Sequence, residues 1–123
     1  MTEERLKLGV WGEDQAVSFL RRHGFKIVTR NMRTPVGEVD IVARNRHYLL
    51  FVEVKTRRSL VCGSPAEAVG AHKQRQIVRA AQWYLLQGHG RGLQPRFDVI
   101  SVLANTHPPK VDHIENAFGL DRG

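Results

Sequence analysis

Two apolar segments that carry acids in their interior constrain this chain more than any other feature. The segments are Gly37–Ala43 and Tyr48–Lys55, and the polar residues Arg44–His47 separate them. Val, Ile, Phe and Tyr are frequent in both segments, and these residue types favour strands. Two such runs around a short polar connection predict a β-hairpin.

Side-chain alternation predicts that the charges of this hairpin gather on one face. Successive side chains of a strand point to opposite faces of the sheet. The expected turn pairs Arg44 with His47. One face then holds the four acidic and basic side chains of the two arms: Glu38, Asp40, Glu53 and Lys55. The other face holds an apolar surface suited to burial: Val39, Ile41, Ala43, Leu50, Val52 and Val54.

The same turn sets the expected register of the hairpin. Glu38 lies opposite Glu53 in this register, and Asp40 lies opposite Phe51, diagonal to Glu53. A slip of one residue would move Asp40 and Glu53 to opposite faces. The predicted site therefore depends on the length of the turn.

Charges inside an apolar hairpin need partners, because a buried charge is costly unless it is paired or bound to a metal. Carboxylates suit Mg²⁺ (or Mn²⁺), since Mg²⁺ takes oxygen ligands and keeps several waters. We expect Asp40 and Glu53 to bind the metal, and Lys55 to orient or deprotonate a bound water or to neutralise charge on a phosphate. This chemistry is metal-assisted phosphodiester hydrolysis. The alternative is a salt-bridge ladder of Glu53, Lys55 and Arg57 on the solvent face of a sheet.

The hairpin also resembles a known signature. Glu38–Asp40 followed by Val52–Lys55 looks like the signature of the PD-(D/E)XK nuclease superfamily. The resemblance is closer to the bacterial YraN-like family, which is related to archaeal Holliday-junction resolvases, and it rests on five motifs in order: Gly12–Ala16, Gly37–Val42, Phe51–Arg57, Gly63–Pro65 and Lys73–Gln74. It implies an α/β fold with a restriction-endonuclease-like core of order αβββαβ, in which helices flank a mixed sheet.

Hydrophobic periodicity predicts the other elements. Helices are expected at residues 2–23 and 71–87, with a short helical turn from Ser64. Strands are expected at residues 25–32 and 97–103, with an edge strand at 111–115.

These elements predict one domain with a short tail. A chain of 123 residues has the usual length of a single domain. We assign residues 1–115 to a nuclease-like domain and residues 116–123 to a flexible C-terminal tail. Asp98 belongs to the fourth strand, where a role at the strand end is expected and an approach to the site is the alternative.

Three more polar residues are candidates for supporting the site. Glu13 lies on the helix face of Ala16, Val17 and Leu20, from which it reaches the metal as a ligand or, in the alternative, reaches solvent. Gln74 starts the apolar stripe of the second helix and hydrogen-bonds a water or phosphate there, or else faces solvent. Glu38 of the hairpin completes this set.

The charge of the chain favours a polyanionic partner. Lys and Arg number 19 against 12 Asp and Glu, which gives a net charge of +7 and a pI near 10.3. Nucleic acid, with DNA preferred to RNA, is the first candidate. Candidate phosphate contacts, each of which has a solvated side chain as its alternative, are Arg30, Arg33, Arg44, Arg57, Arg58, Lys73 and Arg75.

Cysteine content and hydropathy indicate where the protein works. Cys62 is the only cysteine, so an internal disulfide and a cysteine-rich zinc site are excluded, which fits a reducing cytoplasm. No apolar run approaches the roughly 20 residues of a transmembrane helix, and no hydrophobic signal region follows Met1. We expect a cytoplasmic protein with no membrane partner.

The sequence and the resemblance together lead to one functional hypothesis and one alternative. The hypothesis is a divalent-metal-dependent endonuclease that cleaves DNA at branched or structured sites. Symmetric cleavage of a four-way junction would need two active sites, and therefore a homodimer. The alternative is a non-catalytic nucleic-acid-binding module or partner adaptor on a nuclease fold.

Overall fold

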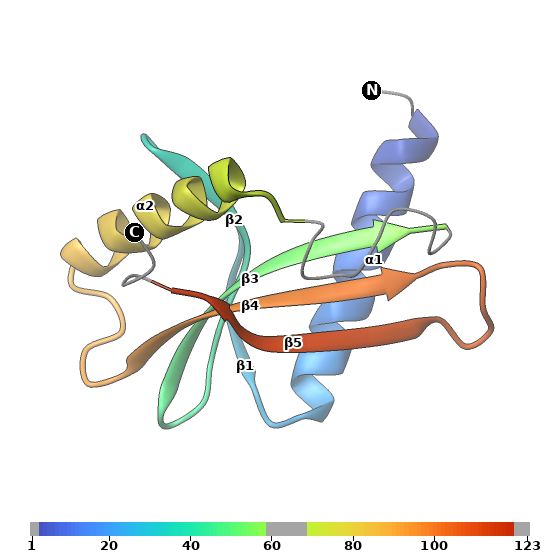
Figure 1. Ribbon diagram of the computed structural model, residues 1–123. Coiled ribbons are helices and arrows are strands. Elements are labelled where there is room, and N and C mark those ends of the chain that lie inside the picture. Colours follow the sequence, from blue (N-terminus) through green and yellow to red (C-terminus); the bar gives the residue numbers. More distant parts are fainter. Residues whose placement is uncertain (1–2, 59–68, 120–123) are drawn as a thin grey trace.

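The protein has a mixed α/β fold with a five-stranded sheet and two helices (Figure 1). The computed structural model describes residues 3–58 and 69–119. The elements, in chain order, are α1 (Glu3–Arg22), β1 (Lys26–Thr34), β2 (Gly37–Arg44), β3 (Tyr48–Arg57), α2 (Ala71–Leu86), β4 (Gln94–Leu103) and β5 (Lys110–Phe118). The predicted mixed α/β class is confirmed. The helical turn expected from Ser64 and the motif Gly63–Pro65 lie outside the described residues.

The sheet has the order β1-β2-β3-β4-β5 and contains one parallel pair. β1, β2 and β3 pair antiparallel with one another, β4 is parallel to β3, and β5 is antiparallel to β4. Parallel neighbours need a long crossover connection, and the segment that contains α2 supplies it. Neither helix of the described chain is long and apolar enough to cross a membrane.

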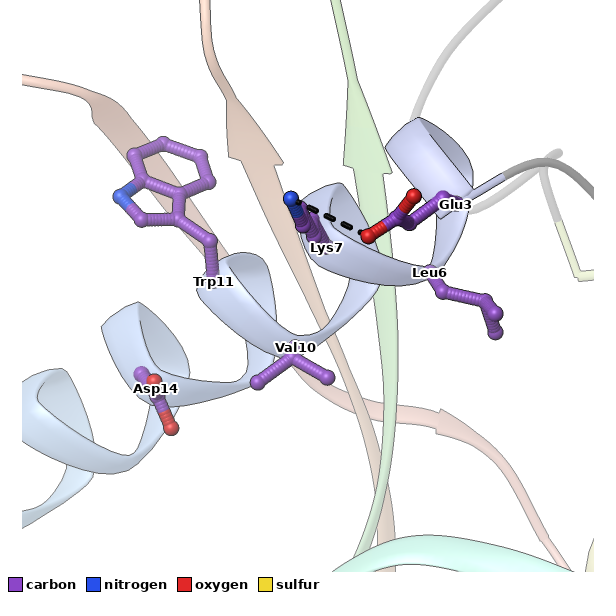
Figure 2. Close-up of a pocket in the computed structure, with 6 residues that line it drawn as sticks. All are labelled: Glu3, Leu6, Lys7, Val10, Trp11 and Asp14. Atoms are coloured by element: carbon purple, nitrogen blue, oxygen red, sulfur yellow. Dashed lines mark ion pairs between the residues drawn. The ribbon is translucent and has the colours of Figure 1, made fainter.

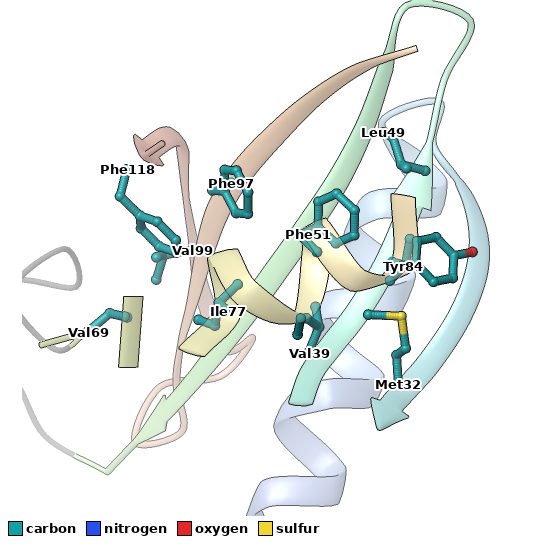
Figure 3. Packing of buried hydrophobic residues seen from close by; sticks show 13 residues of the cluster. Met32, Val39, Leu49, Phe51, Val69, Ile77, Tyr84, Phe97, Val99 and Phe118 are labelled. Carbon is teal, nitrogen blue, oxygen red and sulfur yellow. The ribbon is translucent and has the colours of Figure 1, made fainter. Parts of the chain in front are cut away.

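The two helices cover opposite faces of the sheet and bury two apolar clusters (Figure 1). On the first face, the predicted stripe of Ala16, Val17 and Leu20 is buried, and its partners in the sheet are Ile41, Ala43, Leu50, Val52, Ile100 and Val102. On the other face, Figure 3 shows Ile77 and Tyr84 of α2 beside the apolar side chains of the sheet. Helix α1 thus packs through the amphipathic face that its sequence predicts, and α2 buries Ile77, Ala80, Ala81 and Tyr84.

The turn of the central hairpin differs from the expected one. The Asn45 amide donates to the Tyr48 carbonyl (3.1 Å), and the Asn45 side-chain oxygen accepts from the amides of His47 and Tyr48 (both 2.8 Å). The turn residues are therefore Arg46 and His47, and Arg44 pairs with Leu49 rather than with His47. The register moves by two residues. Because strand side chains alternate with a period of two, this shift by itself does not move any side chain to the other face.

Val39 departs from the prediction that it shares a face with Ile41. Val39 packs with Met32 and Ile77 on the α2 side, whereas Ile41 packs on the α1 side. Pairing between β2 and β3 runs only from Arg44–Leu49 to Ile41–Val52, so β2 is free to turn at Asp40. On β1, Asn31 has a φ of 50°, a conformation that Asn adopts more readily than most residues. This bend in β1 and β2 moves Val39 to the other layer.

The C-terminal strand continues beyond its expected end. β5 extends to Phe118, whose side chain is 2% exposed and stacks on Phe97 with ring centroids 5.3 Å apart. Residues 116–118 therefore belong to the sheet and not to a flexible tail. A short apolar segment after polar residues gave too little periodicity to predict this.

Asp98 lies in the interior of β4 and not at a strand end. It is fully buried, and its oxygens accept hydrogen bonds from Arg96 (3.0 and 2.9 Å) and from the Asn116 amide (3.0 Å), with the His113 ring nitrogen at 2.7 Å. Burial alone would raise the pKa of Asp98, but the bonds from His113 and Arg96 hold this pKa below its usual value. The cluster joins β4 to β5.

Candidate active site

A cleft of about 740 Å³ opens between α1 and the place where β2 separates from β3. Its polar lining includes Glu13 of α1, Asn31 of β1, Asp40 of β2 and Lys55 of β3. The apolar side is formed chiefly by the first turns of α1. Four elements thus bring residues from distant parts of the sequence to one concave surface.

Asp40 is held by the backbone of the neighbouring strand. Its Oδ2 atom accepts a 2.8 Å hydrogen bond from the Val54 amide. This bond connects β2 to β3 beyond the last paired residues, Ile41 and Val52. A carboxylate has about four acceptor positions, so Asp40 keeps oxygen lone pairs for a further ligand.

Glu53 is a buried acid with two lysines at its edge. Its side chain is 6% exposed, and its Oε1 atom lies 4.0 Å from the Lys55 ammonium and 3.9 Å from that of Lys73 in α2. The Oε2 atom is buried and makes no hydrogen bond to the described part of the chain. An unsatisfied buried oxygen costs free energy, so it calls for a ligand.

Burial raises the pKa of Glu53 to about 7, and the negative charge of Asp40 acts in the same direction. The positive charges of Lys73 and Lys55 oppose this rise. The interaction with Asp40 means that the two carboxylates lie close together, as the hairpin alternation predicted. Continuing the observed register by one residue sets Asp40 opposite Glu53.

Glu13 reaches the cleft but is already paired. Its Oε1 atom accepts hydrogen bonds from Arg30 Nε (2.9 Å) and from Asn31 Nδ2 (3.2 Å). A second nitrogen of Arg30 donates to Asp14 at 2.7 Å. Arg30, predicted to contact phosphate, thus holds two acids of α1 against β1.

Glu38 and Gln74 are not brought into this group. Glu38 is 64% exposed and lies 3.7 Å from Arg33, its register partner on β1. Gln74 donates from its side-chain amide to the Val69 carbonyl at 2.9 Å, and so binds the segment that leads into α2. Both predicted supporting residues make local contacts in the structure.

The donor set suits a metal with few protein ligands. Among residues 3–58 and 69–119, no group of three or more His, Cys, Asp or Glu side chains is arranged to hold an ion. Mg²⁺ commonly binds through one or two carboxylates and completes its shell with water and phosphate oxygens. Asp40 and the unsatisfied Oε2 atom of Glu53 fit this mode, whereas Glu13 is engaged by Arg30.

Two residues at this place were missed by the analysis of the sequence. Lys73, expected only as a phosphate contact on the rim, is a direct partner of Glu53. Asn31 lines the cleft and hydrogen-bonds Glu13. Its position within a strand-forming segment offered a weak signal, because asparagine is uncommon in strand interiors. No local pattern relates Lys73 to Glu53, 20 residues earlier in the chain.

The fold and the cleft define a class of small mixed α/β proteins. In this class, two adjacent carboxylates and two lysines lie where the backbone pairing of β2 with β3 ends. The chain belongs to the uncharacterised protein family UPF0102, which residues 12–102 match. This finding confirms the resemblance to the YraN-like family. The matched segment includes every residue of the acid and lysine group.

Relatives in several bacteria support this membership over nearly the whole chain. A UPF0102 protein of Syntrophotalea carbinolica is 60% identical over 98% of this chain and 98% of its own length. A UPF0102 protein of Desulfosudis oleivorans is 46% identical over 96% of this chain and 94% of its own. One from Nocardia farcinica is also 46% identical, over 94% and 91%.

Proposed function

We propose that this protein is a divalent-metal-dependent endonuclease that hydrolyses phosphodiester bonds of branched or structured DNA. One observation carries the proposal: Glu53 is buried beside Asp40, two lysines lie at its edge, and its Oε2 atom makes no hydrogen bond to the residues that the structure describes. The fold proposed with this function is a restriction-endonuclease-like (PD-(D/E)XK) core. The order α1, three strands, α2 and β4 is compatible with that core.

The burial of Glu53 argues against the alternative of a solvent-exposed salt-bridge ladder. Exposed ion pairs add little stability and need no buried acid. A buried carboxylate instead lowers stability unless its partners compensate fully, and an apolar side chain of similar size would pack at lower cost. We infer that this position keeps an acid because of its chemistry.

Each residue of the group has a distinct role in the proposed reaction. Asp40 and Glu53 hold Mg²⁺ or Mn²⁺, which when bound polarises the phosphate and lowers the pKa of a water. Lys55 lies on the cleft wall, where it orients the attacking water or neutralises charge on the phosphate. Lys73 of α2, whose ammonium lies 3.9 Å from the Oε1 atom of Glu53, balances the charge of this acid.

Metal binding is testable without an activity assay. Mg²⁺ or Mn²⁺ should raise the melting temperature of the wild type, and more at pH 8 than at pH 6, because a proton on Glu53 competes with the metal. Asp40→Asn and Glu53→Gln should abolish this shift. Glu38→Gln is the matched control, since Glu38 is an exposed acid of the same hairpin. A metal-induced shift that persists in both site variants would contradict the assignment of the ligands.

Cleavage is tested on branched, single-stranded and linear DNA with Mg²⁺ or Mn²⁺. The wild type and Glu38→Gln should cut, whereas Asp40→Asn, Glu53→Gln and Lys55→Ala should lose at least about 100-fold in rate. Symmetric cuts in a four-way junction would further indicate that a homodimer acts on it. An RNA version of the same substrates separates DNA from RNA specificity.

Intact substrate in all of these assays would favour a non-catalytic module or partner adaptor. Binding of DNA that is unchanged by the site variants would point to the same conclusion. The net charge of +7 supports nucleic-acid binding under either hypothesis.

A further inference from the structure

The N-terminal half of α1 carries an apolar patch of two exposed side chains, Leu6 and Val10, beside Trp11, which packs partly against the core. Leu6 is 54% exposed and Val10 is 60% exposed, and with Trp11 they border a groove of about 340 Å³. Glu3, Lys7 and Asp14 complete its lining. Figure 2 shows Leu6 and Val10 pointing away from the helix axis, with Glu3 and Lys7 joined by an ion pair.

Leu6 and Val10 lie outside the buried face of α1, and Trp11 lies at its edge. Every buried residue of α1 lies at or after Gly12, and the stripe that packs on the sheet ends near Leu20. The N-terminal end of α1 extends beyond the sheet (Figure 1). Exposed apolar side chains that are grouped on one helix face often mark an interaction surface.

The charges of the patch indicate what covers it. Lys7 lies three residues before Val10, and Asp14 lies three residues after Trp11. Two copies of α1 that cross antiparallel at Val10–Trp11 therefore set each Lys7 opposite an Asp14. A parallel pair would set Lys7 against Lys7 and Asp14 against Asp14, which is repulsive. This pattern is self-complementary only under a two-fold axis perpendicular to the helix.

The contacts that Lys7 and Asp14 make in the structure leave both charged side chains available to a second copy. The Lys7–Glu3 pair is 3.4 Å long, but its side chains are 75% and 82% exposed, so it is weak and exchangeable. Asp14 bonds Arg30 and still remains 55% exposed. With two acids and one base, the patch also differs from the +7 chain as a whole, so nucleic acid is a poor occupant and a like copy meets little repulsion.

We propose that α1 forms an antiparallel, two-fold symmetric interface with α1 of a second copy, with Leu6, Val10 and Trp11 at its centre. One helix pair is a small interface, so the dimer is expected to be weak and dependent on concentration. Leu6 and Val10 also line the cleft of the candidate active site, so the interface borders that cleft. The inference does not rest on the proposed function.

Sedimentation equilibrium of the full chain tests the pairing by exchange of charges. Lys7→Glu and Asp14→Lys should each weaken self-association at least about tenfold, because each creates two like-charge contacts. The double variant Lys7→Glu/Asp14→Lys should associate like the wild type. A mixture of the two single variants should form heterodimers while each alone remains monomeric.

The contribution of the apolar residues at the centre of the interface is tested against an exposed leucine of α2 as a matched control. Val10→Lys should weaken self-association at least about tenfold, whereas Leu86→Lys, at a site that is 84% exposed, should leave it unchanged. Far-UV circular dichroism checks that each variant is folded. Two outcomes would overturn the proposal: a wild type that stays monomeric at about 1 mM, or a double variant that fails to recover association. Binding of the patch to anionic lipid vesicles would not change either conclusion.

Discussion

At the residue scale, two glycines of α1 have opposite surroundings. A Cβ atom on Gly9 would meet no atom within 4 Å, whereas a Cβ atom on Gly12 would overlap the Thr56 side chain of β3. Gly9→Ala should therefore raise the free energy of unfolding by about 1 kcal/mol, because alanine is the better helix former. Gly12→Ala should lower it by about 1–3 kcal/mol through overpacking. Urea unfolding measures both.

The matched double variant identifies the cause. Thr56→Ala should rescue Gly12→Ala, since it removes the atoms that the new methyl group would meet. Equal stability changes in Gly9→Ala and Gly12→Ala would mean that only helix propensity matters here, and that the close approach of α1 to β3 is absent.

The raised pKa of Glu53 predicts how stability depends on pH. A carboxyl group with a pKa of about 7 in the folded state, against 4.5 in the reference state, binds its proton more tightly when folded. Its contribution to stability is fully present below pH 4.5 and is lost as the pH rises through 7. The wild type should thus lose about 3 kcal/mol between pH 4.5 and 8 without metal.

Two variants separate this effect from the rest of the molecule. Glu53→Gln should remove most of that pH dependence, whereas Glu38→Gln, which changes an exposed acid, should retain it. Denaturant titrations at pH 5, 6.5 and 8 measure the difference. Parallel curves for the wild type and Glu53→Gln would show that Glu53 is not held in a buried environment.

At the element scale, β5 depends on its last residue. Phe118 is buried and stacks on Phe97, so Phe118→Ala should cost about 3–5 kcal/mol. Removal of residues 116–123 should cost at least as much, although this segment was expected to be a tail. Glu115→Ala, at an acid that is 63% exposed, should change stability by less than about 0.5 kcal/mol. Thermal or urea unfolding would decide whether the domain ends at residue 115 or includes Phe118.

At the scale of the whole molecule, the positive charge should govern binding to DNA. Each phosphate contact that is removed should reduce the slope of log K against log salt by about 0.9. Arg44 of β2 and Arg33 of β1 are both exposed, but Arg33 lies 3.7 Å from Glu38. Arg44→Ala should therefore reduce the slope more than Arg33→Ala. Equal effects, measured by titration at several salt concentrations, would mean that the pairing with Glu38 does not limit Arg33.

Local patterns in the sequence determined the elements and most of their faces. The apolar stripes of α1 and α2, the hairpin, and the face shared by Phe51 and Glu53 follow from periods of 3.6 and 2, which depend only on neighbouring residues. The predicted register of the hairpin was wrong by two residues, but a shift of two residues preserves the alternation of side chains between the faces. The closeness of Asp40 and Glu53 was predictable for the same reason.

Only the tertiary structure decided which partners these side chains meet. Lys73 reaches Glu53 because α2 crosses over the sheet, and Arg30 holds Glu13 because α1 packs beside β1. The bend that moves Val39 to the α2 layer lies where the backbone pairing of β2 with β3 ends. Such contacts join residues far apart in the chain, and their geometry depends on the packing of the whole sheet and not on the periodicity of any one segment.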